Sequence, residues 1–117
     1  MKAYKAVIAG RGDVLLERVV AAVGFWQRLR GLMLRRVLPD GEGLLFPDCR
    51  SVHTCLMRFP LDLAYLDGQN RVVKLVEGLK PWRLSFCPNA DSVLEMNAGR
   101  AQEAGLSEGD RLLLEPA

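Results

Sequence analysis

The chain has 117 residues, of which half are hydrophobic and about a quarter are charged. This length and mix are typical of one domain that buries a real core, and they argue against a disordered chain. The net charge of +2 does not require a nucleic-acid or membrane partner. No apolar stretch approaches the roughly 20 residues that span a bilayer, and the first ten residues are too broken for a secretory signal. We therefore expect a single domain over residues 1–117, located in the cytoplasm, without nucleic acid or membrane.

The first half of the chain predicts strands that flank one amphipathic helix. Residues 5–9 and 13–20 are rich in Val and Ala and predict two strands joined by a turn. In residues 25–35, apolar side chains recur at the spacing of one helix face. Arg28 and Arg35 fall on the opposite face. This arginine face is either a solvated surface or a docking surface for a partner.

The middle of the chain predicts four more strands. Residues 43–46 form a short apolar strand, and Cys49 follows it in a loop. Residues 50–58 alternate with a period of two and carry apolar groups on both faces, so we expect this strand to be covered on both sides. Residues 61–66 and 71–77 predict a hairpin, because Asp67-Gly68 is a strong turn signal between them.

The last third predicts a loop, two strands and a second short helix. Residues 78–89 are expected to be irregular, and residues 92–96 and 111–114 to be strands. Asn97 suits the N-cap of a helix over residues 98–104, and Gly105 suits its end. Strands and helices do not alternate regularly, which disfavours a parallel doubly wound sheet. We expect an α+β fold, with a mostly antiparallel, strongly curved sheet or small β-barrel and two short helices.

One polar cluster is expected in the central segment. His53 is the single histidine of the chain, and Asp62 interrupts an otherwise apolar strand. A buried carboxylate must be paired or hydrogen-bonded, and His53 and Arg58 are the nearest cations along the chain. The three residues are either structural or the lining of a pocket. Trp82 lies next to Arg83 in the following loop and either contributes to a binding surface or closes one end of the barrel.

The three cysteines, Cys49, Cys55 and Cys87, suggest a second kind of site. Their odd number argues against a fully paired disulfide framework. Cys49, His53 and Cys87 could converge as a thiol site, because a cysteine beside a histidine and arginines can act as a nucleophile. Their spacing is not that of a zinc motif, so no metal and no cofactor are expected. The alternative is that all three cysteines pack as small buried hydrophobes.

Three polar residues near the C-terminus are interpreted as turn and cap chemistry. They are Glu95, Asn97 and Asp110. Asp110 follows Gly109 and is expected to bind backbone amides. There is no serine-nucleophile motif and no phosphate-binding loop, so the catalytic residues, if the chain has any, stay unknown.

The order of several motifs resembles the family called domain of unknown function 192. The motifs run from Arg28-Leu29-Arg30-Gly31-Leu32-Met33 and Gly43-Leu44-Leu45-Phe46 through Ser51-Val52-His53-Thr54, Met57-Arg58-Phe59-Pro60-Leu61-Asp62, Leu66-Asp67, Leu79-Lys80-Pro81-Trp82-Arg83, Val93-Leu94-Glu95 and Asn97-Ala98-Gly99 to Gly105-Leu106 and Gly109-Asp110. The resemblance implies a compact β-rich α+β domain without an established role. Within the family, the chain looks like the branch with His-Thr in the central strand. Members of that branch often have an aromatic residue at the position of Cys55, so Cys55 is expected only to pack.

We therefore expect a non-enzymatic binding or accessory module with a polar cleft around His53, for a small ligand or a protein partner. Its ligand-binding residues would be His53, Arg58, Asp62, Trp82, Cys49 and Cys87. The alternative is a thiol- or metal-dependent enzyme that uses Cys49, His53 and Cys87.

Overall fold

A computed structural model describes residues 3–21, 38–53 and 59–116, and in these ranges it shows nine strands and one short helix. The strands are β1 (Ala3–Ile8), β2 (Asp13–Ala21), β3 (Glu42–Pro47), β4 (Ser51–His53), β5 (Leu61–Leu66), β6 (Val72–Leu79), β7 (Leu84–Phe86), β8 (Ser92–Asn97) and β9 (Leu112–Pro116). The helix is α2 (Arg100–Ala104).

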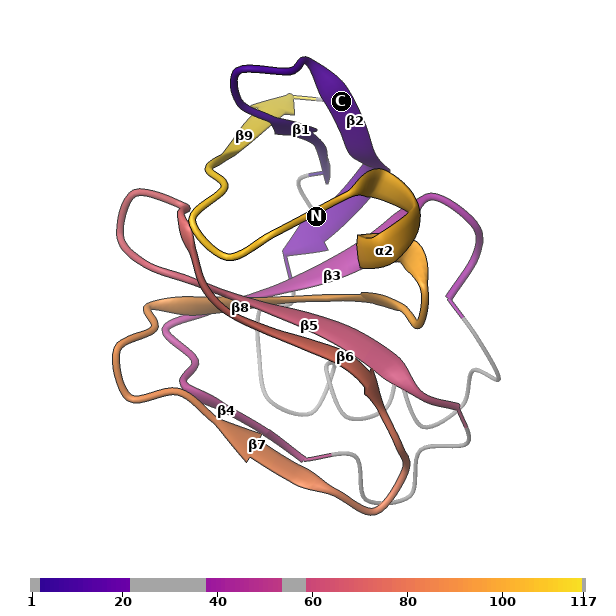
Figure 1. The fold of residues 1–117 in the computed structure, drawn as a ribbon, viewed down its shortest axis with the longest axis vertical. Helices are drawn as coiled ribbons and strands as arrows, with labels where there is room; N and C mark the ends of the chain where they lie inside the picture. The colour runs from indigo at the N-terminus through magenta and orange to yellow at the C-terminus, as the bar shows by residue number, and fades with distance from the viewer. Residues whose placement is uncertain (1–2, 22–37, 54–58, 117) are drawn as a thin grey trace.

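Seven strands form one curled sheet in the order β6-β5-β8-β3-β2-β1-β9. Its neighbouring strands are antiparallel, except that β2 and β3 run parallel. The remaining strands, β4 and β7, pair as a separate antiparallel ribbon. Figure 1 shows the sheet curling into a half-barrel, with the β4–β7 ribbon at the end of the molecule opposite β1 and β9.

The sheet separates two apolar clusters, because side chains of a strand alternate between its faces. In β5 every residue is buried. Leu61, Leu63 and Tyr65 join the cluster that lies toward the β4–β7 ribbon. Ala64 and Leu66 join the second cluster, which also holds Ala101 of α2. Because Asp62 has the same parity as Ala64, it points to the α2 side of the sheet.

The prediction of a mostly antiparallel, strongly curved sheet is confirmed. The β5–β6 hairpin forms as expected, and the Asp67 carboxylate accepts hydrogen bonds from the backbone N–H groups of Gln69 and Arg71 at 2.9 Å each. These two donors lower the pKa of the Asp67 carboxyl group. The sequence predicts two short helices, whereas the described ranges contain one. The helix predicted over residues 25–35 lies outside these ranges.

The loop predicted over residues 78–89 is wrong in part, because it contains β7 and the end of β6. β7 has only three residues and pairs with β4 rather than with a sequence neighbour. The expected covering of both faces of the strand over residues 50–58 is also wrong where the structure describes it, since Ser51 is exposed while Val52 is buried. Residues 54–58 lie outside the described ranges.

The predicted N-cap of the second helix is wrong as well. Asn97 ends β8, and its side-chain amide exchanges two hydrogen bonds with the backbone of Leu38. The N-cap of α2 is Gly99, with a left-handed φ of 93° and no side-chain cap of its own. The Asp62 carboxylate from β5 accepts the backbone N–H groups of Gly99 and Ala101 instead. Gly105 ends the helix in the left-handed conformation, as predicted.

Gly43 explains why β3 can lie so close to its neighbours. A Cβ at this position would come within 2.5 Å of the Leu16 side chain and 2.8 Å of the Glu95 carbonyl oxygen. Because real Cβ atoms do not approach so closely, only glycine allows β2, β3 and β8 to pack as they do.

Candidate functional site

The β4–β7 ribbon exposes large apolar side chains on its outer face. Leu84 and Phe86 are 69% and 60% exposed, and they share one face because they are two residues apart on a strand. Trp82, in the loop just before β7, is 61% exposed and holds a left-handed backbone with a φ of 62°. This conformation is rare for a bulky residue and is found mainly where surrounding structure enforces it. We call these three residues the apolar stripe.

The inner face of the ribbon is fixed to the main sheet. Ser85 lies between Leu84 and Phe86 and is buried. The Tyr65 hydroxyl from β5 donates a hydrogen bond to the Ser85 hydroxyl at 3.0 Å. Burial raises the pKa of the Tyr65 hydroxyl, and the nearby Cys49, Cys87 and Glu95 groups raise it further, whereas the bond to Ser85 opposes them. The phenol therefore stays neutral and anchors the ribbon.

Glu95 is a buried carboxyl group on the same side of the sheet as Tyr65. It is 2% exposed, and its Oε2 atom has no hydrogen-bond partner among the residues that the structure describes. Desolvation raises its pKa from 4.5 to about 8, because burial in a medium of low polarity disfavours the charged form. The interpretation of Glu95 as a turn or cap residue is therefore wrong: it is a protonated core group at neutral pH.

Three of the predicted site residues accompany the ribbon. The Cys87 backbone N–H bonds the Arg50 carbonyl oxygen at 2.8 Å, and Cys87 is buried in the cluster beneath the ribbon. Cys49 is partly buried against the same cluster, and its thiol donates to the Ser51 carbonyl oxygen at 3.0 Å. His53 ends β4, where its backbone pairs with Leu84; the structure does not describe its side chain.

The other predicted residues do not join them in one cleft. Trp82 is part of the stripe, so it is exposed rather than closing the barrel. The Asp62 carboxylate is fully buried on the opposite side of the sheet. It accepts three backbone N–H groups, from Gly99, Ala101 and, at 2.8 Å, Gly78. The prediction that Asp62 is hydrogen-bonded is confirmed, but the partners shown are backbone amides. Arg58 lies outside the described residues.

Several cations lie near the apolar stripe along the chain or in the fold. Residues 78–90 contain the exposed Lys80 and Arg83 and no carboxylate. Arg83 donates to the carbonyl oxygens of Pro81 and Trp82, and Arg50, before β4, donates to that of Ala90. Lys74 of β6 lies 5.8 Å from the centre of the Tyr65 ring and donates from Nζ to the Phe86 carbonyl oxygen at 3.0 Å. Of these cations, Lys74 is the one that contacts the edge of β7 directly.

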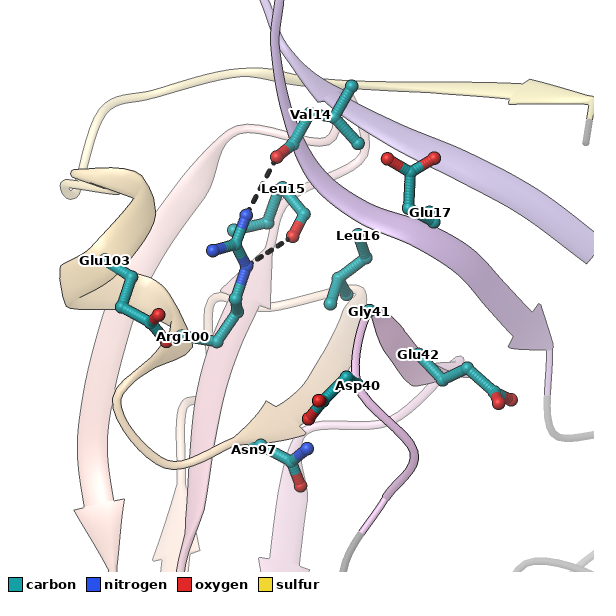
Figure 2. A pocket seen from close by; sticks show the side chains of 10 residues that line it. All are labelled: Val14, Leu15, Leu16, Glu17, Asp40, Gly41, Glu42, Asn97, Arg100 and Glu103. Carbon is teal, nitrogen blue, oxygen red and sulfur yellow. Dashed lines mark hydrogen bonds between the residues drawn. The ribbon is translucent and has the colours of Figure 1, made fainter.

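A hollow of about 340 Å³ lies elsewhere, between β2, the turn before β3 and α2. Figure 2 shows the carboxylates of Glu17, Asp40, Glu42 and Glu103 around it. The Arg100 guanidinium is not offered to a ligand there, since it donates to the carbonyl oxygens of Leu15 at 2.8 Å and Val14 at 3.0 Å. Three of the four acidic residues are exposed, which is typical of a solvated surface.

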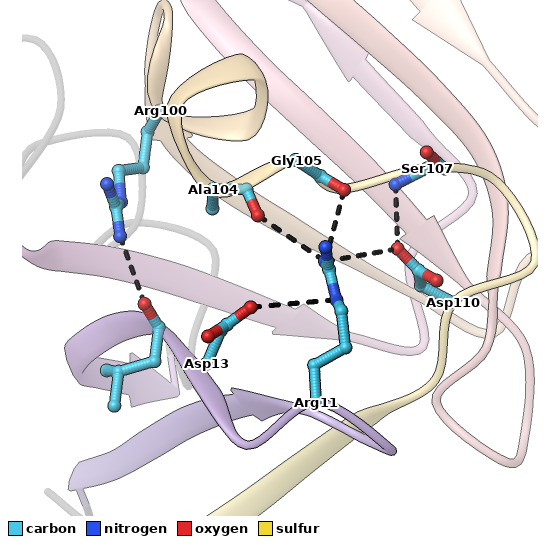
Figure 3. A network of polar contacts seen from close by, with 8 residues as sticks. Arg11, Asp13, Arg100, Ala104, Gly105, Ser107 and Asp110 are labelled. Atoms are coloured by element: carbon cyan, nitrogen blue, oxygen red, sulfur yellow. Dashed lines mark hydrogen bonds and ion pairs between the residues drawn. The ribbon is translucent and has the colours of Figure 1, made fainter.

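The adjoining polar network in Figure 3 also serves the fold. Arg11, at the β1–β2 turn, donates to the carbonyl oxygens of Ala104 and Gly105 at the end of α2. It also forms ion pairs with Asp13 at 3.7 Å and Asp110 at 3.8 Å. The Asp110 carboxylate accepts the backbone N–H of Ser107, which confirms its predicted role. These contacts fix the helix end and leave the ribbon as the better candidate site.

Within the described ranges, no three His, Cys, Asp or Glu side chains are grouped so that they could hold a metal ion. No helix of those ranges is long and apolar enough to cross a membrane.

Leu84 and Phe86 have no strong signal in the sequence, and the burial of Glu95 differs from its interpretation as turn or cap chemistry. The alternation of Leu84, Ser85 and Phe86 is the period of a strand, but three residues after a proline and a tryptophan are too few to predict one. Glu95 could have been found by the reasoning applied to Asp62, because it too interrupts an apolar run, from Val93 to Met96.

Comparison with known proteins identifies the family. The family model of domain of unknown function 192, described as uncharacterized, matches residues 7–114. A crystal structure from Sinorhizobium meliloti 1021, described as a "putative transcription regulator", has a TM-score of 0.83 and 30% sequence identity, covering 97% of this chain and 94% of that one. A protein of unknown function from Novosphingobium aromaticivorans DSM 12444 has the same fold, with a TM-score of 0.76 at 22% identity over 95% of this chain and 84% of that one.

The search of curated proteins found no match. The family model spans nearly all of the chain and includes both faces of the half-barrel and the ribbon. The chain belongs to the domain of unknown function 192 family.

Proposed function

We propose that the protein is a non-enzymatic binding module that docks a protein partner on the outer face of the β4–β7 ribbon. The observation that carries the proposal is the apolar stripe: Trp82, Leu84 and Phe86 are each at least 60% exposed. Covering the exposed part of a leucine or phenylalanine side chain contributes roughly 1–2 kcal/mol. Exposed aromatic residues next to arginine are also the composition that is enriched in protein interfaces.

The anchored inner face supports the same proposal. Ser85 is bonded to Tyr65, and Val52 and Cys87 are buried beneath the ribbon. Leu84 and Phe86 are therefore presented on an anchored strand, which lowers the entropic cost of binding. The description of the Sinorhizobium relative as a regulator is compatible with a module that acts by contacting another macromolecule.

The alternative of a thiol enzyme has less support. The Cys49 thiol donates a hydrogen bond to a carbonyl oxygen, which is a role of the protonated form. Cys87 is buried, and a catalytic thiol needs access to its substrate. Both cysteines belong to the packing beneath the ribbon, so we rank thiol or metal chemistry below binding.

A photo-crosslinking experiment in cells that express the protein tests the proposal. A benzophenone amino acid replaces Phe86 in one variant and Leu113 in another. Leu113 is the matched control, because it is 40% exposed on β9 at the far end of the molecule (Figure 1). We expect a discrete adduct at position 86 that disappears when Leu84→Ser is added. Equal labelling at both positions, or an adduct insensitive to Leu84→Ser, would contradict the proposal.

A further inference from the structure

The register of the ribbon shows where the backbone groups of β7 point. Ser51 pairs with Phe86 and Val52 with Ser85, so Arg50 lies opposite Cys87. The Cys87 N–H donates to the Arg50 carbonyl oxygen, which makes this a hydrogen-bonded pair. In an antiparallel ladder such pairs alternate with pairs whose N–H and C=O groups point away from the partner strand. The backbone groups of Leu84 and Phe86 therefore point to the edge of β7 that lies away from β4.

Among the described strands, β4 is the partner of β7. One group on the outer edge is occupied by a side chain: the Lys74 ammonium donates to the Phe86 carbonyl oxygen at 3.0 Å. A lysine that covers a strand edge is a common protection against unwanted strand pairing. The Lys74 ammonium also occupies the position at the Phe86 carbonyl oxygen where a backbone N–H of an added strand would lie.

We propose that the partner supplies an extended segment of alternating acidic and apolar residues, which adds as a strand to the outer edge of β7. This inference rests on the proposed function, and it specifies the occupant of the same site. Backbone bonds to Leu84 and Phe86 would supply affinity, and alternate apolar side chains of the segment would stand beside the same two residues on the outer face. The N–H of the segment replaces Lys74 at the Phe86 carbonyl oxygen, and the released ammonium pairs with a carboxylate of the segment.

Charge decides between this occupant and a second copy of the chain. The Lys74 ammonium lies at the edge that the added strand would occupy, and residues 78–90 next to it in the site carry no carboxylate. Two copies joined through this surface would bring like charges together, which is unfavourable across an interface. An acidic segment supplies the charge opposite to that of Lys74 at this edge.

Three labelled eight-residue peptides test the inference by fluorescence anisotropy with the full chain. The first alternates Glu and Leu, the second replaces each Glu by Lys, and the third is the first with N-methyl groups on alternate backbone nitrogens along the pairing edge. We expect the acidic peptide to bind at least tenfold more tightly than either of the others, because N-methylation removes the backbone donors. In Lys74→Met the preference for Glu over Lys shrinks, whereas Lys5→Met on β1 leaves it unchanged.

Equal affinity of the N-methylated and unmodified acidic peptides would overturn strand addition. Equal affinity of the acidic and basic peptides would overturn the assigned charge, and no binding of the acidic peptide would overturn the inference as a whole. None of these peptide results removes the proposed function, which is tested separately by crosslinking at position 86 and by the Leu84 variants.

Discussion

Replacing Glu95 by glutamine should remove a pH dependence of stability that the fold imposes. The pKa of the Glu95 carboxyl group is raised from 4.5 to about 8 by burial. Between these values the native protein holds a proton that the unfolded chain releases. The free energy of unfolding therefore falls as pH rises, by about 1.4 kcal/mol per unit. The stabilisation is complete below pH 4.5 and is lost as the pH rises toward 8. At pH 7 the stability already lost amounts to roughly 3 kcal/mol.

Urea denaturation of the wild type and Glu95→Gln at pH 5, 6, 7 and 8 measures this effect. Glutamine is neutral throughout, so its own cost of burial does not vary with pH. We expect Glu95→Gln to gain stability relative to the wild type by about 1.4 kcal/mol for each pH unit from 5 to 7. Glu77→Gln, at an exposed position of β6, is the control and should track the wild type. A difference between wild type and Glu95→Gln that stays constant from pH 5 to 8 would refute the reasoning.

Three further substitutions test the supports of the site by chemical denaturation. Asp62→Ala removes the acceptor of three backbone N–H groups and should lower the free energy of unfolding by about 2–4 kcal/mol. Hydrogen exchange at the Ala101 amide should become faster, and unchanged exchange there would contradict the capping role of Asp62. Tyr65→Phe should cost about 1 kcal/mol, and a double-mutant cycle with Ser85→Ala should be non-additive, since both changes break one bond. Gly43→Ala should cost about 1–3 kcal/mol through the steric clash with its neighbours; a neutral effect would contradict the close approach.

The strands that sequence analysis predicted well are those with a local signal. β5 was placed at its observed bounds, because its apolar run ends at Asp67-Gly68, whose turn chemistry is encoded in neighbouring residues. β7 was missed because its existence depends on β4, more than 30 positions earlier, and not on its own three residues. Asn97 was misplaced for a similar reason: an N-cap pattern is local, whereas its actual partner, Leu38, is 59 positions away.

The candidate site was predicted only in part for the same physical reason. The apolar neighbours of Asp62 indicate that its carboxylate must be hydrogen-bonded. Proximity in the sequence suggests side-chain partners for it. In the fold its partners are instead backbone amides from β6 and α2. Cys87 and Trp82 were placed in one loop, yet one is buried and the other exposed. Only the pairing of β7 with β4 sets which side chains face the core and which form the apolar stripe.

The most direct test of docking on the ribbon compares complexes from cells that express the protein at its natural level. Tagged wild-type protein and Leu84→Asp are separated by size-exclusion chromatography without crosslinking, after circular dichroism has shown that the variant is folded. Because Leu84 is exposed, the substitution should leave the fold intact while placing a charge in the apolar stripe. We predict that the wild type elutes in a complex larger than the monomer and that Leu84→Asp elutes as the monomer. Identical elution of the two proteins would contradict the account.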